Sequence, residues 1–122
     1  MAREGRIQAT IQARKGNYNV MLPPIQFQFD WATAKSCAGT QTIPTSDTVI
    51  GFGDLSTLGY AAFHNLDTAH SVKLGPQASG AIADGITLGP GQWAIFPLTA
   101  GSVWRAQAVG GSVELEKWIL AL

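Results

Sequence analysis

The side chains best suited to metal chemistry are two histidines with an aspartate between them. His64, Asp67 and His70 follow the pattern H-x-x-D-x-x-H, and imidazole and carboxylate groups are ordinary ligands of divalent metals. The pattern falls on a turn expected at Asn65-Leu66-Asp67, and it lacks the compact H-x-H with a following Glu that a cupin metal site would use. We therefore predict no metal site and no cofactor, and we expect two turn histidines, one of them bonded to a backbone carbonyl.

No set of polar residues predicts nucleophilic or acid–base catalysis, and we expect that the protein is not an enzyme. Cys37 is the single cysteine, which suits a reducing compartment and predicts a small, half-buried side chain. A nucleophile needs a histidine and an acid placed beside it, and no such arrangement is visible. Arg105 is expected to form a structural ion pair or to stack on an aromatic ring rather than to bind a ligand. The aspartates fall mostly in expected turns: Asp30, Asp47, Asp54, Asp67 and Asp84. A glycosidase-like pair of carboxylates that is brought together only by folding remains an alternative.

Four tryptophans support either a sugar-binding platform or a set of anchors for the core and for interfaces, and we favour the anchors. The strand expected at 92–98 is apolar on both sides, with Trp93 and Ile95 on one of them. Because only one side fills an interior, the other side requires a cover, which is a second layer or another subunit. Pro97 cannot donate to a sheet ladder, so this strand lies at an edge or is bulged there.

Alternating apolar and polar residues predict a chain made of strands. The alternation is clear at 6–14 and again at 25–31, where Phe27, Phe29 and Trp31 share one face and are expected to anchor the core. Pro23-Pro24 is expected to end a short strand that begins at residue 18. Further strands are expected at 47–52, 60–65, 71–74, 86–88, 92–98, 103–108 and 113–122, with a loop or an irregular edge strand at 32–48.

About nine short strands separated by turn residues are typical of an all-β fold. We predict an antiparallel β-sandwich of jelly-roll topology with little or no helix, because helical periodicity is almost absent. A chain of 122 residues fits one domain, so we expect an N-terminal arm at residues 1–6 and a single sandwich at 7–122. Residues 118–122 are apolar on both faces, which predicts a central strand or a strand paired with a neighbouring subunit.

The low charge of the chain predicts a surface that is covered by other protein. Charged residues make up 13% of the chain and the net charge is zero, against roughly 25% charged residues in soluble domains. The polar positions are filled instead by Gln, Asn, Ser and Thr, which cost less to desolvate than Lys or Glu.

We expect an acidic protein surface, rather than nucleic acid or a membrane, as the partner of the N-terminal segment. The first 20 residues carry four cations against Glu4, a net charge of +3, which is too sparse for a nucleic-acid stripe. No apolar run approaches the 18 or so residues of a spanning helix, and no apolar segment follows Arg3 and Arg6 as in a secretory signal.

The second half of the chain resembles a class of known proteins. It contains the segments GYAAFHNLDTAHSVKLG (59–75), LGPGQWAIFPL (88–98), VWRAQA (103–108) and VELEKWIL (113–120). Together these are similar to small all-β virion proteins encoded in the structural modules of tailed bacteriophages. The resemblance covers roughly residues 58–122, and it implies no catalytic residues.

The resemblance implies a virion protein assembled in the bacterial host cytoplasm, and within that class we favour a capsid decoration, or cement, protein. Such a protein is expected to form a homotrimer or another homo-oligomer. It would bind the major capsid protein or other virion proteins through contact area alone. The alternatives are a neck, tail or baseplate subunit of the same particle and a carbohydrate-binding module. The interface candidates are Arg3, Arg6, Trp93, Ile95 and Trp118.

Overall fold

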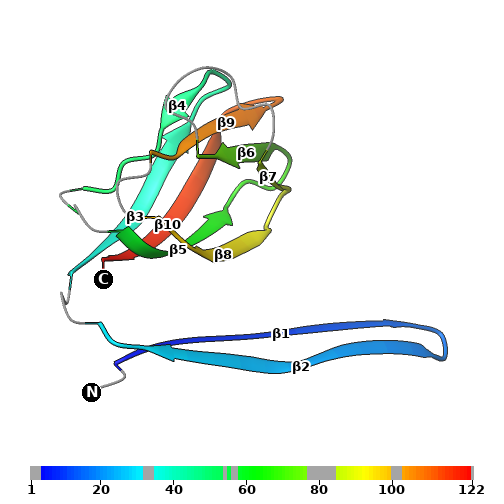
Figure 1. The fold of residues 1–122 in the computed structure, drawn as a ribbon. Coiled ribbons are helices and arrows are strands. Elements are labelled where there is room, and N and C mark those ends of the chain that lie inside the picture. The colour runs from blue at the N-terminus through cyan, green and yellow to red at the C-terminus, as the bar shows by residue number, and fades with distance from the viewer. Residues whose placement is uncertain are drawn as a thin grey trace. The chain divides into compact units, whose positions relative to one another are not determined.

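The chain is built from antiparallel β-strands and divides into two compact units (Figure 1). The structure is a computed structural model that describes residues 4–31, 35–53, 55, 58–76, 85–99 and 103–121. The units are Met1–Ala32 and Thr33–Leu122. The described residues form no helix, and therefore none that is long and apolar enough to cross a membrane. The predicted all-β antiparallel class is confirmed, whereas the jelly-roll topology stays a prediction.

The first unit is a two-stranded ribbon of β1 (Gly5–Lys15) and β2 (Tyr18–Phe29). The two strands are joined by a two-residue turn, in which Gly16 adopts a φ of 59° that suits a residue without a Cβ. The structure thus divides the chain near residue 32, and not after residue 6 as the sequence suggested. Residues 5 and 6 belong to β1 instead of forming a free arm.

β2 runs through Pro23-Pro24, although the sequence predicted that the prolines end a strand. Pairing passes from Ala9 with Ile25 to Ile11 with Leu22, so two residues of β2 stand opposite Thr10. This β-bulge tolerates the prolines, because the residues at a bulge leave the regular ladder and need not donate an N–H. The Thr10 hydroxyl donates to the Leu22 carbonyl at 3.2 Å across the bulge.

The bulge also decides which side chains share a face of the ribbon. Residues directly opposite in an antiparallel pair lie on the same face, and the extra residue shifts the alternation of β2 by one position. The consequence is a continuous apolar side, here called the apolar ribbon face, with Lys15 at its turn end: Ile7, Ala9, Ile11, Ala13, Tyr18, Val20, Leu22 and Phe27. The opposite side is mainly polar: Arg6, Gln8, Gln12, Arg14, Asn19, Met21, Gln26 and Gln28.

The predicted aromatic core anchor is wrong for Phe27, which is 50% exposed. Phe29 is buried, but it packs over Gly5 within the ribbon rather than in a sandwich. Alternation reports that one side of a strand is apolar. It does not report which part of the chain, or which other chain, covers that side.

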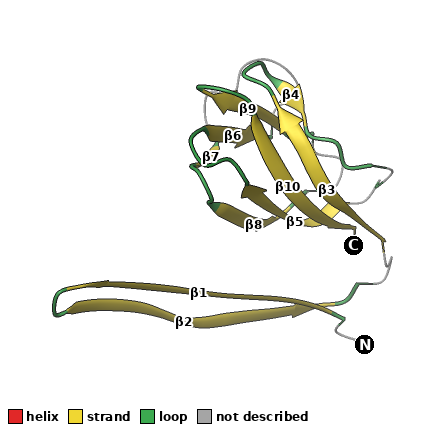
Figure 2. Cartoon of the chain, turned by 180° about the vertical axis from the view of Figure 1, so that it is seen from behind, coloured by secondary structure: helices red, strands yellow, loops and turns green. Residues whose placement is uncertain are grey.

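The second unit is a pair of four-stranded sheets packed face to face (Figures 1 and 2). The large sheet has the order β3-β10-β5-β8, with bounds Lys35–Ile43, Val113–Ala121, Leu58–Asn65 and Trp93–Pro97. The small sheet has the order β4-β9-β6-β7, with bounds Thr48–Val49, Arg105–Val109, Ser71–Gly75 and Ile86–Leu88.

Alternate residues of both sheets fill one core. In β10 the buried and outward positions alternate along the whole strand. The core includes Ile43, Phe63, Leu115 and Ile119 from the large sheet and Val72, Leu74, Leu88 and Ala106 from the small sheet.

Three predictions about strand position are confirmed. The apolar C-terminal segment is a central strand, because β10 lies between β3 and β5. The segment predicted as a loop or an irregular edge strand at 32–48 contains the edge strand β3, although β3 pairs with β10 without a break in register. β8, which contains Pro97, is the other edge of the same sheet.

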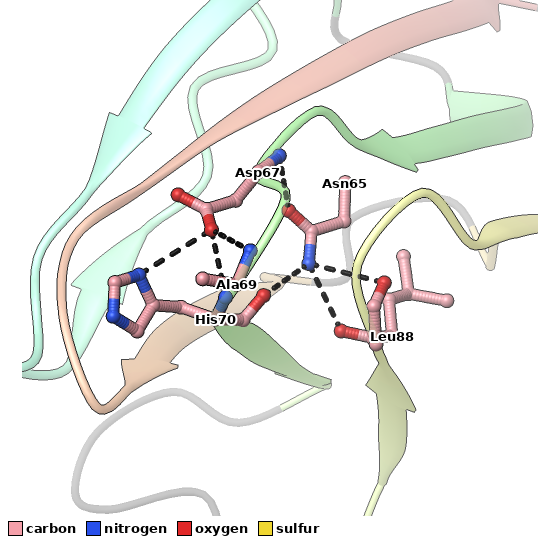
Figure 3. Close-up of polar contacts among 6 residues, drawn as sticks. Asn65, Asp67, Ala69, His70 and Leu88 are labelled. Atoms are coloured by element: carbon pink, nitrogen blue, oxygen red, sulfur yellow. Dashed lines mark hydrogen bonds and ion pairs between the residues drawn. The ribbon is translucent and has the colours of Figure 1, made fainter.

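Asn65 ties the end of the large sheet to the small sheet (Figure 3). Its fully buried side-chain amide donates to the carbonyls of His70, Leu88 and Gly89 at 2.9, 3.1 and 3.2 Å. The side-chain carbonyl accepts the backbone N–H of Asp67 at 3.0 Å. The sequence placed Asn65 in a turn but gave no sign that it was buried.

Replacing Asn65 with Ala is expected to lower the free energy of unfolding by about 2–4 kcal/mol, because several buried polar groups lose their partner. Urea unfolding followed by tryptophan fluorescence measures this loss. Asn19→Ala, the same change at an exposed ribbon position, is the control and should stay within about 0.5 kcal/mol of the wild type. A loss at Asn65 as small as that of the control would contradict the assignment.

Candidate interaction surface

The outward side of the large sheet carries a cluster of apolar and aromatic side chains. The core-facing positions of β5, β8 and β10 are covered by the small sheet, whereas their alternate residues point the other way. The register places His64 opposite Trp93 and Ala62 between Ile95 and Trp118. We call this surface the aromatic face, and it consists of Tyr60, Ala62, His64, Trp93, Ile95, Pro97, Trp118 and Leu120.

The aromatic face brings together three of the five predicted interface residues. Trp93 is 52% exposed, Ile95 49% and Trp118 38%, which is high for large apolar side chains. Of the other two candidates, Arg6 lies exposed on the polar side of the ribbon, and Arg3 lies outside the described residues. Contact of these five residues with a partner stays a prediction.

The rings of the aromatic face stack in parallel. The ring centroids of His64 and Trp93 are 4.0 Å apart, those of Trp93 and Trp118 are 5.4 Å apart, and both interplanar angles are 8°. One face of each ring is therefore already covered by another ring of the cluster. A parallel separation of 5.4 Å is too short for two indoles lying side by side in one plane, so the two tryptophans do not form a flat double platform.

The charges on this side of the large sheet are acidic. Among the described residues of its four strands, the alternation places two carboxylates there, Glu114 and Glu116, and no lysine or arginine. Glu114 accepts a hydrogen bond from the Thr42 hydroxyl at 2.5 Å. Glu116 lies 3.3 Å from His64 Nδ1. The aromatic face is thus bordered by acids at the Val113 end of β10.

The ribbon presents a second uncovered apolar surface. On the apolar ribbon face, Tyr18 is 73% exposed and Ile11 64%, and Val20, Leu22 and Phe27 are exposed as well. A two-stranded ribbon is at best marginally stable in water, because it has no second layer to bury its apolar side. This surface was not predicted from the sequence, because the alternation at 6–14 and 25–31 is also typical of strands inside a sandwich.

The remaining tryptophans play other parts. Trp104 packs on Phe96 at a ring distance of 4.8 Å and lies against the core. Trp31 belongs to the ribbon unit, where its backbone N–H donates to the Glu4 carboxylate at 3.1 Å.

The histidine–aspartate motif divides between the end of β5 and the turn that follows it. No group of three or more His, Cys, Asp or Glu side chains suited to a metal occurs in the described part of the chain. His64 lies on β5, within the strand predicted at 60–65, and stacks on Trp93, so the expectation of two turn histidines is wrong for His64. The turn follows at Asn65, where it was predicted, and the buried side chain of Asn65 organises it.

The Asp67 carboxylate closes this turn (Figure 3). Its Oδ1 accepts the backbone N–H groups of Ala69 and His70, both at 2.7 Å, and lies 3.3 Å from His70 Nδ1. These hydrogen bonds, first that from Ala69 and then that from His70, hold the pKa of Asp67 below its ordinary value of 3.8. An open depression of about 340 Å³ lies between residues 64–68 and the Pro90-Gly91 turn.

Two isolated polar residues are structural, as the sequence predicted. Arg105 Nε lies 2.8 Å from both carboxylate oxygens of Asp47, and this carboxylate raises the pKa of the guanidinium. The predicted structural ion pair is therefore confirmed. Cys37 is half-buried against the core, also as expected.

A buried lysine was missed by the sequence. Lys117 is 9% exposed, and its ammonium group donates to Gln41 Oε1 at 3.2 Å and to the carbonyl of Gly51. Gln41 Oε1 also accepts the Gly51 N–H at 3.0 Å. These hydrogen bonds join β3 and β10 to the segment after β4, so Lys117 has a structural role.

No family model, no curated protein and no solved structure matches the chain.

Replacing Asp67 with Asn is expected to remove one source of acid sensitivity. Because the pKa of Asp67 is lower in the folded state than its unfolded value of 3.8, the carboxylate stabilises the fold above that value. The stabilisation is lost as the pH falls from there through the folded-state pKa. Asparagine still accepts the turn hydrogen bonds but has no charge to lose.

Urea unfolding from about pH 6 to about pH 2 measures this difference. The wild type should exceed Asp67→Asn in stability near neutrality, and this advantage should disappear in acid. A stability difference between the two proteins that is constant with pH would contradict the role of the carboxylate.

Proposed function

We propose that this protein is a structural subunit of a tailed bacteriophage particle, most specifically a capsid decoration, or cement, protein. It would act through contacts with other protein subunits and without chemistry of its own. The observation that carries this proposal is the pair of uncovered apolar surfaces, the aromatic face and the apolar ribbon face.

The energetics of these surfaces favour assembly. Removing apolar surface from water is worth about 25 cal/mol per Å², and monomeric proteins rarely expose large contiguous apolar patches. The aromatic face contains two stacked tryptophans that are both exposed. Tryptophan is a typical anchor residue of protein interfaces. The low content of charged residues, 13%, agrees with a surface that other protein covers.

The assignment to a phage particle rests on the sequence resemblance of residues 58–122. The quoted segments supply β5, β6, β8, β9 and β10, and therefore most of the second unit. A neck, tail or baseplate subunit of the same particle would use the same kinds of contact, so the position on the particle is part of what the experiment tests.

The arrangement of the tryptophans favours a protein partner over a sugar. A carbohydrate platform of two tryptophans presents two ring faces side by side in one plane, whereas the ring centroids of Trp93 and Trp118 lie only 5.4 Å apart at an interplanar angle of 8°. Their exposed parts suit insertion between apolar side chains of another subunit.

The proposal predicts that the purified full chain binds shells assembled from the major capsid protein alone. Co-sedimentation should show saturable binding, and bound protein should raise the temperature at which the shells disassemble, because each added contact must be broken first. Binding to tail or baseplate assemblies instead of shells would move the protein to that part of the particle. Hits on a glycan array without binding to any of these assemblies would overturn the proposal in favour of a carbohydrate-binding module.

A further inference from the structure

We propose that the apolar ribbon face of one copy packs on the aromatic face of a second copy. This inference rests on the proposed function, since it names a contact by which the subunits would join one another. It concerns self-association, whereas shell binding tests the function itself.

The two surfaces match in chemistry. Each is apolar, uncovered and made of strands: Ile11, Tyr18 and Val20 are exposed on the ribbon, and Trp93 and Ile95 on the sheet. The ribbon is also long enough. Its strands of 11 and 12 residues reach about 35 Å at roughly 3.3 Å per residue, whereas four strands spaced about 4.8 Å apart are some 15–20 Å wide.

The two units carry opposite net charge. Residues 1–32 contain four cations, Arg3, Arg6, Arg14 and Lys15, and two anions, Glu4 and Asp30, which gives +2. Because the whole chain has a net charge of zero, residues 33–122 carry −2. Opposite charges on two surfaces favour their encounter and disfavour pairing of each surface with itself.

The local charges specify which surfaces meet. Lys15 lies at the turn end of the apolar ribbon face, and Glu114 and Glu116 lie at one end of the outward side of the large sheet. In one orientation, pairing of the ribbon with the sheet places Lys15 near both carboxylates. Pairing of either surface with its own copy offers no opposite charge among these three residues. The ribbon-to-sheet contact is therefore the one that can pair them.

This geometry makes the contact head-to-tail, because each copy offers one surface and accepts the other. Such contacts close into a ring when the rotation between copies permits, and otherwise extend as a chain. The predicted homotrimer would be one such closed ring.

The first test places a carboxylate in each surface of the full-length protein. Val20→Glu on the ribbon and Ile95→Glu on the sheet should each weaken self-association about tenfold or more, because a charge would be buried without a partner. The matched controls are Met21→Glu, on the other side of the ribbon, and Val109→Glu on β9, both at exposed apolar positions. Analytical ultracentrifugation measures self-association, and circular dichroism checks that each variant is folded.

The second test mixes the two disrupted variants. Val20→Glu retains an intact aromatic face and Ile95→Glu retains an intact ribbon, so the mixture should form a 1:1 dimer at concentrations at which each variant alone is largely monomeric. The dimer should also protect tryptophan fluorescence from acrylamide, since Trp93 and Trp118 become covered. Complementation of this kind requires two functional copies, so it does not arise from a variant that fails to fold.

The third test reverses the charges. Lys15→Glu alone and Glu114→Lys with Glu116→Lys should each weaken association, whereas all three changes in one chain should restore it. If self-association is equally strong in all these variants, the inference is overturned, while shell binding and hence the proposed function are unaffected. A wild-type monomer with protected tryptophans would also overturn it, because the cover would then come from the same copy. A wild-type protein that stays monomeric and binds shells would overturn the inference too, and would indicate that the aromatic face contacts the capsid protein.

Discussion

The second unit depends on the double pairing of β10. This strand is hydrogen-bonded along its length to β3 on one side and to β5 on the other, and its alternate residues serve two different purposes. Leu115 and Ile119 are fully buried in the core, whereas Trp118 faces outward beside Trp93. One strand therefore fixes both the interior of the sandwich and the surface that we propose for assembly. A shift of its register by one residue would exchange the two sets of side chains.

Hydrogen-bonded polar side chains, two of them buried, hold the loops of the sandwich to the ends of its sheets. Asn65 satisfies carbonyl groups of three residues, Asp67 satisfies two backbone amides, and Lys117 bonds to Gln41 and Gly51. Asn65 and Lys117 are buried, and their hydrogen bonds offset the cost of burying a polar group. Asp67, the central residue of the histidine–aspartate motif, thus holds a turn, because a turn uses side-chain oxygen acceptors as a metal does.

The ribbon shows how one irregularity creates a surface. Without the bulge at Pro23-Pro24 the two halves of β2 would place their apolar residues on opposite faces, and neither face of the ribbon would be continuous. With the bulge, Val20 and Leu22 join Phe27 on the same side. The prolines also discourage extension of this part of the ladder by another strand, since they lack an N–H. The ribbon is therefore suited to packing through a face.

Local pattern determined the strand content, the edge position of β8, the central position of the C-terminal segment and the Arg105 ion pair, because alternation, proline and lone charges act over a few residues. It also marked Trp93, Ile95 and Trp118 as candidates for contact. Only the tertiary structure decided that these three share one face, since β8 and β10 are distant in sequence and meet across β5. The tertiary structure likewise decided that residues 1–32 form a separate ribbon and that Asn65 is buried. An apolar side of a strand shows that something must cover it. What covers it depends on contacts between segments far apart in the chain, which local sequence does not specify.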